Sequence, residues 1–263
     1  MKIDSLKCQD ASVRFFCFGA LEGQPLVIIP GVALKSVTES ADLIAEQYRS
    51  AAENHRIIVI DRRSPVGEDC SIKVLAQDVI DVLDSLSVKN ADLYGVSQGG
   101  LIAQAVAVMR SGLVRKLVLC STAAEIDENA AEILGKWRRL AERRDISGLM
   151  SSFAENVYSP AYCEKYREAF VEFGKTVSDE EMRDFAVMLG CMDCEDIRGK
   201  LGGLRCPVLV MAGDNDRIFD VNQAERLAEL TNGELCIYKG QAHGVYDELP
   251  DVLGKIISFL EEV

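Results

Sequence analysis

The sequence predicts an α/β fold: a mostly parallel, twisted sheet flanked by helices, with an all-helical cap inserted between two strands. Short β-branched runs alternate with amphipathic stretches from Gln24 onward. This rhythm stops between Thr122 and Leu204, where helix-forming residues with charges and aromatics take over. At 263 residues the chain is long enough for one sizeable core with an insertion.

Strand-like and helix-like segments follow one another in a regular order. Strands are expected at 25–31, 56–61, 92–96, 116–120, 206–213 and 234–240. Helices are expected at 36–48, 72–86, 101–109, 223–230 and 252–263. The stretch at 13–19 is expected to add antiparallel edge strands.

The insertion divides the expected domain organisation. Residues 1–121 and 205–263 are predicted to form the core domain, and residues 122–204 the helical cap or lid. Because the insertion follows a strand whose carboxyl end faces the same edge as the other strand ends, it is placed to roof a site there.

Composition and charge narrow the classes of partner. A formal net charge of −13 argues against nucleic acid and anionic membranes, so a small-molecule substrate is expected. The N-terminal stretch lacks an apolar signal core and no apolar run is long enough to cross a bilayer, which predicts a cytoplasmic protein. The nine cysteines suggest reduced, mostly buried thiols, and a homo-oligomer is left open.

A glycine-bordered serine marks the candidate site. The run GVSQG at 95–99 stands between the strand-like 92–94 and the helix expected at 101–109. A strand-to-helix turn of this kind exposes the Ser97 hydroxyl, and the flanking glycines allow neighbouring chains to approach. The helix that starts after Ser97 directs its first N–H groups toward developing negative charge, so the Gln98 N–H is a candidate oxyanion donor.

A serine nucleophile needs a base and an acid. Of the two histidines, His55 is expected at a helix end or on the surface, away from the carboxyl edge, whereas His243 follows the last expected strand. Asp214 and Asp216 both follow the strand expected at 206–213. The resulting chain order of Ser97, aspartate and His243 is typical of one serine-hydrolase architecture.

With these residues in place, the whole chain resembles the α/β-hydrolase superfamily, in particular its small serine hydrolases with a helical cap. The resemblance implies Asp216 rather than Asp214 as the triad acid, because that acid usually lies three residues after the glycine. It also implies a second oxyanion N–H from the loop IPGV at 29–32, which by position is that of Val32. Pro30 replaces the usual histidine in that loop.

The sequence differs from the family again after the strand expected at 56–61. There the family commonly has an arginine-glycine turn, whereas this chain has DRRSPVG at 61–67. Arg62 and Arg63 are expected either to bind an anionic substrate or, as is more common for such charges, to pair with Asp61 and neighbouring acids.

For the aromatic residues of the insertion and for two of its cysteines, both a structural and a functional interpretation are possible. Aromatic side chains of the insertion can line an acyl pocket, but at helical spacing they more often pack the cap; they are Trp137, Phe153, Tyr158, Tyr162 and Tyr166. Cys191 and Cys194 form a CxxC run without a second cysteine pair or a nearby histidine, so packing is expected. No metal and no organic cofactor are expected, since no phosphate-binding glycine loop or ligand cluster occurs.

The sequence therefore predicts a serine hydrolase that cleaves an ester, thioester, lactone or similar carbonyl bond of a small molecule through an acyl-enzyme. The same triad also serves carbon–carbon bond cleavage, lyase, aminopeptidase and perhydrolase chemistry, which motifs do not separate. A non-catalytic ligand-binding protein of the same fold and an interaction platform are the alternatives outside catalysis. An aspartate nucleophile, and with it halide release, is excluded by Ser97.

Overall fold

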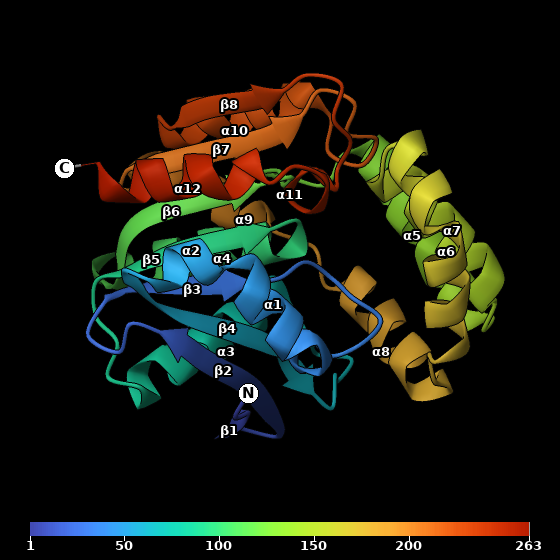
Figure 1. The fold of residues 1–263 in the computed structure, drawn as a ribbon, viewed down its shortest axis with the longest axis horizontal. Coiled ribbons are helices and arrows are strands. Elements are labelled where there is room, and N and C mark those ends of the chain that lie inside the picture. The colour runs from blue at the N-terminus through green and yellow to red at the C-terminus, as the bar shows by residue number, and fades with distance from the viewer. Residues whose placement is uncertain (263) are drawn as a thin grey trace.

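The structure is a computed structural model and describes residues 1–262. One sheet of eight strands runs through it in the order β1-β2-β4-β3-β5-β6-β7-β8 (Figure 1). The pairs β1–β2 and β2–β4 are antiparallel, and the remaining pairs are parallel. The strands are β1 (Asp4–Cys8), β2 (Ala11–Gly19), β3 (Gln24–Ile29), β4 (His55–Ser64), β5 (Ala91–Val96), β6 (Val114–Cys120), β7 (Val208–Gly213) and β8 (Glu234–Tyr238).

Helices cover both faces of the sheet. The core helices are α1 (Ala41–Gln47), α2 (Arg49–Ala52), α3 (Ile72–Ser85), α4 (Gln98–Met109), α10 (Val221–Thr231), α11 (Val245–Glu248) and α12 (Asp251–Glu261), with short 3-10 helices η1 (Val37–Ser40), η2 (Ser111–Leu113) and η3 (Leu201–Gly203). On β3, Leu26 and Ile28 pack toward the face covered by α1, α2 and α12, whereas Val27 and Ile29 pack toward α3, α4 and α10. Successive side chains of a strand point to opposite faces, so apolar residues at consecutive positions are buried on both sides.

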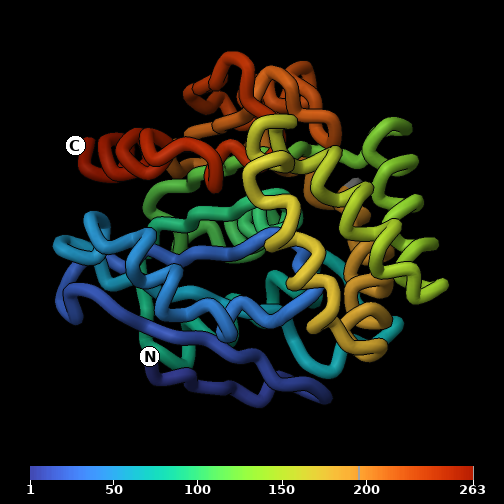
Figure 2. Tube along the Cα trace, turned by 45° about the vertical axis from the view of Figure 1, so that its right-hand side comes forward, coloured from blue at the N-terminus to red at the C-terminus, as the bar shows by residue number. Residues whose placement is uncertain are grey.

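The helical insertion lies between β6 and β7, as the sequence predicts. It contains α5 (Glu128–Glu142), α6 (Ile146–Val157), α7 (Pro160–Lys175), α8 (Asp179–Gly190) and α9 (Glu195–Arg198). Helices α5 to α8 stand beside the sheet at the end where the parallel strands finish, as Figures 1 and 2 show. The short α9 instead contacts α4 of the core. The α/β fold class with an inserted helical cap is thus confirmed.

Several local expectations are confirmed and others are corrected. The stretch at 13–19 lies within antiparallel β2, but β1 rather than β2 forms the edge. The expected helix at 36–48 is divided between η1 and α1. The loop expected from 62 onward begins later, because β4 remains paired with β2 as far as Ser64.

His55 requires a further correction. It is the first residue of β4 and only 4% exposed, so the surface position considered for it is wrong. Its Nδ1 lies 3.1 Å from the carbonyl oxygen of Ala51 in α2, which matches the helix-end position that was also considered. Within residues 1–262, no helix combines the length and apolarity needed to cross a membrane.

Candidate active site

Ser97 occupies the turn between β5 and α4. Its backbone has φ 53° and ψ −121°, a conformation that non-glycine residues rarely adopt. The Ser97 N–H donates to the carbonyl of Cys120 at 3.0 Å, and the Thr122 hydroxyl donates to the Ser97 carbonyl at 2.8 Å. Strand β6 and the residues after it therefore hold this strained turn in place.

Two glycines make the turn possible. A Cβ on Gly95 would lie 2.4 Å from the carbonyl oxygen of Gly99, so the strand and the helix could not approach as they do. A Cβ on Gly99 would lie 2.0 Å from the carbonyl oxygen of Ile29 at the end of β3. The motif glycines are thus required by backbone contacts between β5, α4 and the loop after β3.

His243 and Asp216 are brought together from separate loops. His243 lies between β8 and α11 and is 3% exposed, and Asp216 follows β7 with a fully buried side chain. Asp216 Oδ2 lies 2.7 Å from His243 Nδ1. The other oxygen, Oδ1, accepts from the N–H groups of Ile218 at 2.8 Å and Phe219 at 2.9 Å. The carboxylate is therefore oriented by backbone amides as well as by the imidazole.

Asp214 has a different neighbour. Its Oδ1 accepts from the Gly240 N–H at 2.6 Å, at the turn that follows β8. Of the two aspartates that follow β7, only Asp216 is hydrogen-bonded to the histidine. Asp214 lies on the exposed side of the same loop and caps the neighbouring turn.

Residues 121 and 122 connect the serine to the histidine, a role the sequence did not reveal. The Ser121 hydroxyl donates to the His243 carbonyl at 2.7 Å, and the adjacent Thr122 bonds the Ser97 carbonyl. Within residues 1–262, Ser97 Oγ makes no hydrogen bond to the His243 ring. Such bonds often tighten only when substrate binds. A polar pair directly after a buried strand is the one signal that points to Ser121 and Thr122.

The loop after β3 passes directly against Ser97. A Cβ built on Gly31 would lie 3.2 Å from Cβ and 3.8 Å from Oγ of Ser97. Within the described part of the chain, neither the Val32 N–H nor the Gln98 N–H donates to another group. Both residues line one small cavity of about 40 Å³. Unpaired amide donors beside a serine hydroxyl are able to stabilise an anionic oxygen.

The side chain of Gln98 links this region to the cap. Its Nε2 donates to the carbonyl of Met188 in α8 at 2.7 Å, and the residue is 1% exposed. At the other end of α8, Glu181 lies 3.4 Å from Lys35 of the loop after β3. The cap helix α8 is thus attached to both segments that carry the unpaired N–H groups.

Arg62 and Arg63 have different partners. Arg63 is 2% exposed and forms a bidentate pair with Asp78 of α3, at 2.8 and 3.2 Å. Burial raises the pKa of Asp78, and the hydrogen bond from Arg63 acts in the opposite direction. Arg62 turns instead to the loop after β3, where its guanidinium donates to three backbone carbonyls. Within the described residues, neither guanidinium forms the ion pair with Asp61 that was considered; Arg63 pairs instead with another acid, Asp78 of α3.

The cap also contacts the segment that holds His243. The Gly244 N–H donates to the Val157 carbonyl at 2.6 Å, and a Cβ on Gly244 would lie 2.6 Å from the Tyr158 ring. The Tyr158 hydroxyl donates to Asp247 at 2.9 Å. Burial and the neighbouring Asp247 carboxylate raise the pKa of Tyr158, so the phenol remains a donor. The junction of α6 and α7 is therefore docked on the loop that presents the imidazole.

The remaining cap aromatics pack against each other. The ring centroids of Trp137 and Phe153 lie 4.9 Å apart, and Trp137 Nε1 lies 3.2 Å from Ser152 Oγ. Tyr162 stacks on Tyr158 at 4.6 Å, and Tyr166 lies 4.4 Å beyond it. The packing interpretation of these aromatic side chains is the one that these contacts support.

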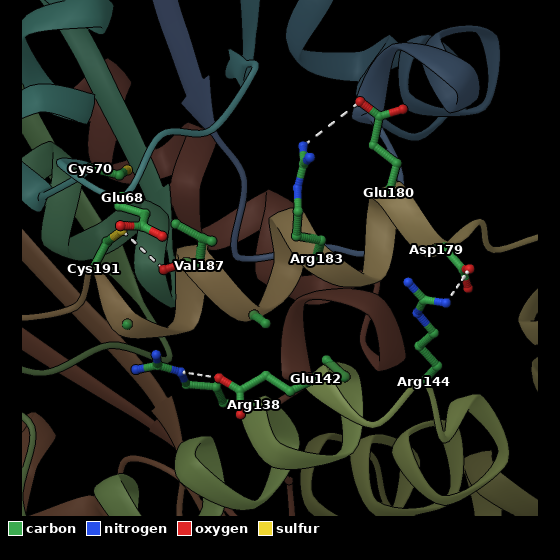
Figure 3. Close-up of a pocket in the computed structure, with 13 residues that line it drawn as sticks. Glu68, Cys70, Arg138, Glu142, Arg144, Asp179, Glu180, Arg183, Val187 and Cys191 are labelled. Carbon is green, nitrogen blue, oxygen red and sulfur yellow. Dashed lines mark hydrogen bonds and ion pairs between the residues drawn. The ribbon is translucent and has the colours of Figure 1, made fainter.

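A large cavity elsewhere does not include the serine or the histidine. It measures about 800 Å³ and lies between α5, α8 and the segment before α3 (Figure 3). Six of its charged side chains form three ion pairs: Arg138 with Glu142 at 2.9 Å, Arg144 with Asp179 at 2.9 Å, and Arg183 with Glu180 at 3.8 Å. These pairings use all three arginine charges of the cavity, and the carboxylate of Glu68 also lines it.

Both cysteines of the CxxC run contact backbone. Cys191 Sγ lies on the wall of the large cavity and donates to the Val187 carbonyl at 3.1 Å. Cys194 Sγ donates to the Ala124 carbonyl at 3.3 Å. Within residues 1–262, no group of three or more histidine, cysteine or acidic side chains is arranged to hold a metal ion.

Comparisons with known proteins place the chain in a family. A family model described as serine aminopeptidase, S33, matches residues 67–250, more than half of the chain. The chain is 24% identical over 235 residues to 3-oxoadipate enol-lactonase 2 of Acinetobacter baylyi, covering 86% of this chain and 84% of that relative.

The crystal structure of the enol-lactonase from Burkholderia xenovorans LB400 matches with a TM-score of 0.86 at 19% identity, covering 98% of this chain and 100% of that chain. The crystal structure of MGS-M2, an alpha/beta hydrolase enzyme from a Medee basin deep-sea metagenome library, matches with a TM-score of 0.89 at 18% identity. This match covers 99% of this chain and 98% of that chain. The chain therefore belongs to the serine aminopeptidase (S33) family of α/β-hydrolase enzymes.

Proposed function

We propose that this hydrolase cleaves an ester, thioester or lactone bond of a small molecule through an acyl-enzyme on Ser97. The observation that carries the proposal is the 2.7 Å contact between His243 Nδ1 and the buried Asp216 carboxylate. A carboxylate only accepts hydrogen bonds, so it selects the imidazole tautomer that carries a proton on Nδ1 and leaves Nε2 free as a base. Ser97 stands on the adjacent strained turn.

In the proposed first step, Ser97 Oγ attacks the substrate carbonyl carbon while His243 Nε2 takes the hydroxyl proton. The N–H groups of Gln98 and Val32 stabilise the oxyanion, each contributing about 3 kcal/mol if comparable donors are a guide. His243 then gives the proton to the leaving oxygen or sulfur, and that bond to the acyl carbon breaks. Water then attacks the acyl carbon while His243 Nε2 takes one of its protons. The bond between Ser97 Oγ and the acyl carbon breaks, His243 returns the proton to Ser97 Oγ, and the acid is released.

We further propose that residues 122–204 act as a cap domain over a core formed by residues 1–121 and 205–263, of which residue 263 lies outside the described part of the chain. The attachments of Met188 to Gln98 and of Tyr158 to Asp247 support this division, because they place cap groups next to the segments that carry Ser97 and His243. A cap in this position bounds the volume left for the substrate, which favours a small molecule.

The family and the relatives suggest two substrate classes within one mechanism. The matched relatives include enol-lactonases, which favours a lactone or ester, whereas the family description favours an N-terminal aminoacyl peptide. A panel of aliphatic lactones and p-nitrophenyl esters alongside aminoacyl p-nitroanilides separates them. Hydrolysis of the lactones or esters alone supports the proposal, and cleavage restricted to the anilides assigns the aminopeptidase reaction instead.

Labelling with a fluorophosphonate probe tests the nucleophile directly. The protein is expected to form one adduct, located on Ser97 by peptide mass spectrometry, and Ser97→Ala is expected to form none. Ser151→Ala is the matched control, because Ser151 lies on the exposed side of α6, where its hydroxyl donates to Glu155 of the same helix. A folded protein that forms no adduct, or an adduct on another serine, would overturn the proposal.

A further inference from the structure

The loop that carries Val32 is held by one arginine. Residues 30–36 join β3 to η1 and have no regular secondary structure. Arg62 Nη1 donates to the carbonyls of Ala33 at 2.6 Å and Lys35 at 3.0 Å, and Nη2 donates to the carbonyl of Leu34 at 2.8 Å. Three consecutive carbonyls, beginning one residue after Val32, therefore converge on a single guanidinium.

The residue before Arg62 fastens the far end of the same loop. The buried Asp61 carboxylate accepts from the Ser36 hydroxyl and, at 2.9 Å, from the Arg62 N–H. Ser36 Oγ in turn accepts from the Thr38 N–H at 3.2 Å, at the start of η1. The end of β4 thus binds the loop at two places, through Asp61 and through Arg62.

The position of this loop determines the distance between Val32 and Ser97. Its first residues are pressed against the turn, since Gly99 leaves no room for a Cβ beside the Ile29 carbonyl and Gly31 lies in contact with Ser97. Pro30 has no N–H and no polar side chain with which to fix the loop. The guanidinium of Arg62, which lines the same small cavity as Val32, supplies the missing donors, and its planar fork suits several carbonyls at once.

We propose that Arg62 is a positioning residue for the oxyanion hole, holding the carbonyls of residues 33–35 so that the Val32 N–H remains directed at the oxygen bound over Ser97. This inference rests on the proposed function. It differs from a substrate-binding role because the Nη atoms of Arg62 already donate to backbone carbonyls. A misplacement of about 1 Å in such a site costs on the order of 100-fold in rate.

The test measures fluorophosphonate labelling as a function of probe concentration, which separates the limiting rate from the half-saturating concentration. Arg62→Gln is expected to lower the limiting rate about 10- to 100-fold while the half-saturating concentration changes less than about 3-fold. The limiting rate of Arg62→Lys is expected to fall between those of Arg62→Gln and the unmodified protein. An ammonium group donates from a single nitrogen, whereas the guanidinium reaches the three carbonyls from two nitrogens. Methylguanidinium added to Arg62→Ala is expected to restore part of the rate.

Arg14→Gln is the matched control. Arg14 lies 3.6 Å from the same Asp61 carboxylate but bonds none of the loop carbonyls, so its removal should leave the limiting rate within about 2-fold. Thermal unfolding of each variant identifies any that fail to fold, in which case Arg62→Lys and the methylguanidinium rescue decide the question.

The outcomes separate this inference from the proposed function. Folded Arg62 variants that label at the unmodified rate would overturn the inference alone. So would an unchanged limiting rate with a raised half-saturating concentration, which would assign Arg62 to substrate binding. If the unmodified protein forms no adduct at Ser97, the proposed function fails and this inference fails with it.

Discussion

Asp216 and His243 are 27 positions apart in the chain, yet Oδ2 of the aspartate lies 2.7 Å from Nδ1 of the histidine. The same aspartate accepts two backbone N–H groups through its other oxygen. Its side chain has no exposed surface, so each of these interactions is made away from water. The imidazole is consequently held in one orientation by a group that is itself fixed by the backbone.

Asp216→Asn should abolish most of the activity without unfolding the protein. An amide oxygen can still accept from Ile218 and Phe219, but the NH₂ group toward His243 favours the wrong tautomer, so kcat should fall on the order of 10⁴-fold. Ester or lactone hydrolysis and fluorophosphonate labelling measure the effect. Asp214→Asn is the control and should retain activity, since Asp214 bonds Gly240 rather than the histidine. Equal losses in both variants would contradict the assignment.

Gly99→Ala should destabilise the protein and impair the site together. The new Cβ would lie 2.0 Å from the Ile29 carbonyl oxygen, so the loop that carries Val32 must move away from the turn. We expect the free energy of unfolding in urea to fall by about 1–3 kcal/mol and labelling at Ser97 to slow. Gly112→Ala, where no atom lies within 4 Å of the added Cβ, should change stability by less than about 0.5 kcal/mol. Unchanged stability and labelling in Gly99→Ala would show that the close approach is not needed.

Asp78→Asn should be strongly destabilising. It would leave the guanidinium of Arg63, which is 2% exposed, without its bidentate carboxylate, at a cost of about 3–5 kcal/mol in the free energy of unfolding. Asp84→Asn removes an aspartate–arginine pair, with Arg110, that lies exposed at the surface, and should cost far less. Urea unfolding of both variants compares the two sites directly, and similar losses would show that burial of the Arg63 pair is unimportant.

Glu181 should contribute stability that depends on pH. Partial burial acts to raise its pKa, but hydrogen bonds from Ser178 and the charge of Lys35 outweigh it, so the net shift is downward. Because the pKa of Glu181 is lower in the folded state, the ionised carboxylate stabilises the fold fully at pH values above its pKa in the unfolded chain, about 4.3. This stabilisation is lost as the pH falls through the pKa of the folded state. Glu181→Gln should therefore cost about 0.5–1 kcal/mol at pH 7 and less at pH 3.

The control for this prediction is Glu180→Gln. Glu180 is exposed and its nearest cationic partner, Arg183, lies 3.8 Å away, so little change is expected at either pH. Urea unfolding at the two pH values measures the difference between variant and unmodified protein. A loss for Glu181→Gln that persists unchanged at pH 3 would rule out the ionised carboxylate as its source.

Much of the fold could be predicted because it depends on local pattern. The apolar runs of β3 and β5 and the apolar helix α4 are buried on all sides, and such runs stand out in the sequence. The end of β4 was missed, since Arg62 and Ser64 are polar residues and polar residues usually mark a loop. They remain in the strand because β2 pairs with β4 from the other side, a contact between distant segments.

The sequence by itself determined the alternation of strands and helices, the inserted cap, and the placement of Ser97, Asp216 and His243 each after the end of a strand. These follow from periodicity and from turn-forming residues, which act over a few positions. Only the tertiary structure decided that Asp216 rather than Asp214 meets the imidazole, that Ser121 and Thr122 connect His243 to Ser97, and that Arg62 binds the loop after β3. Those contacts depend on strand register and on the course of loops between distant residues, which no local pattern encodes.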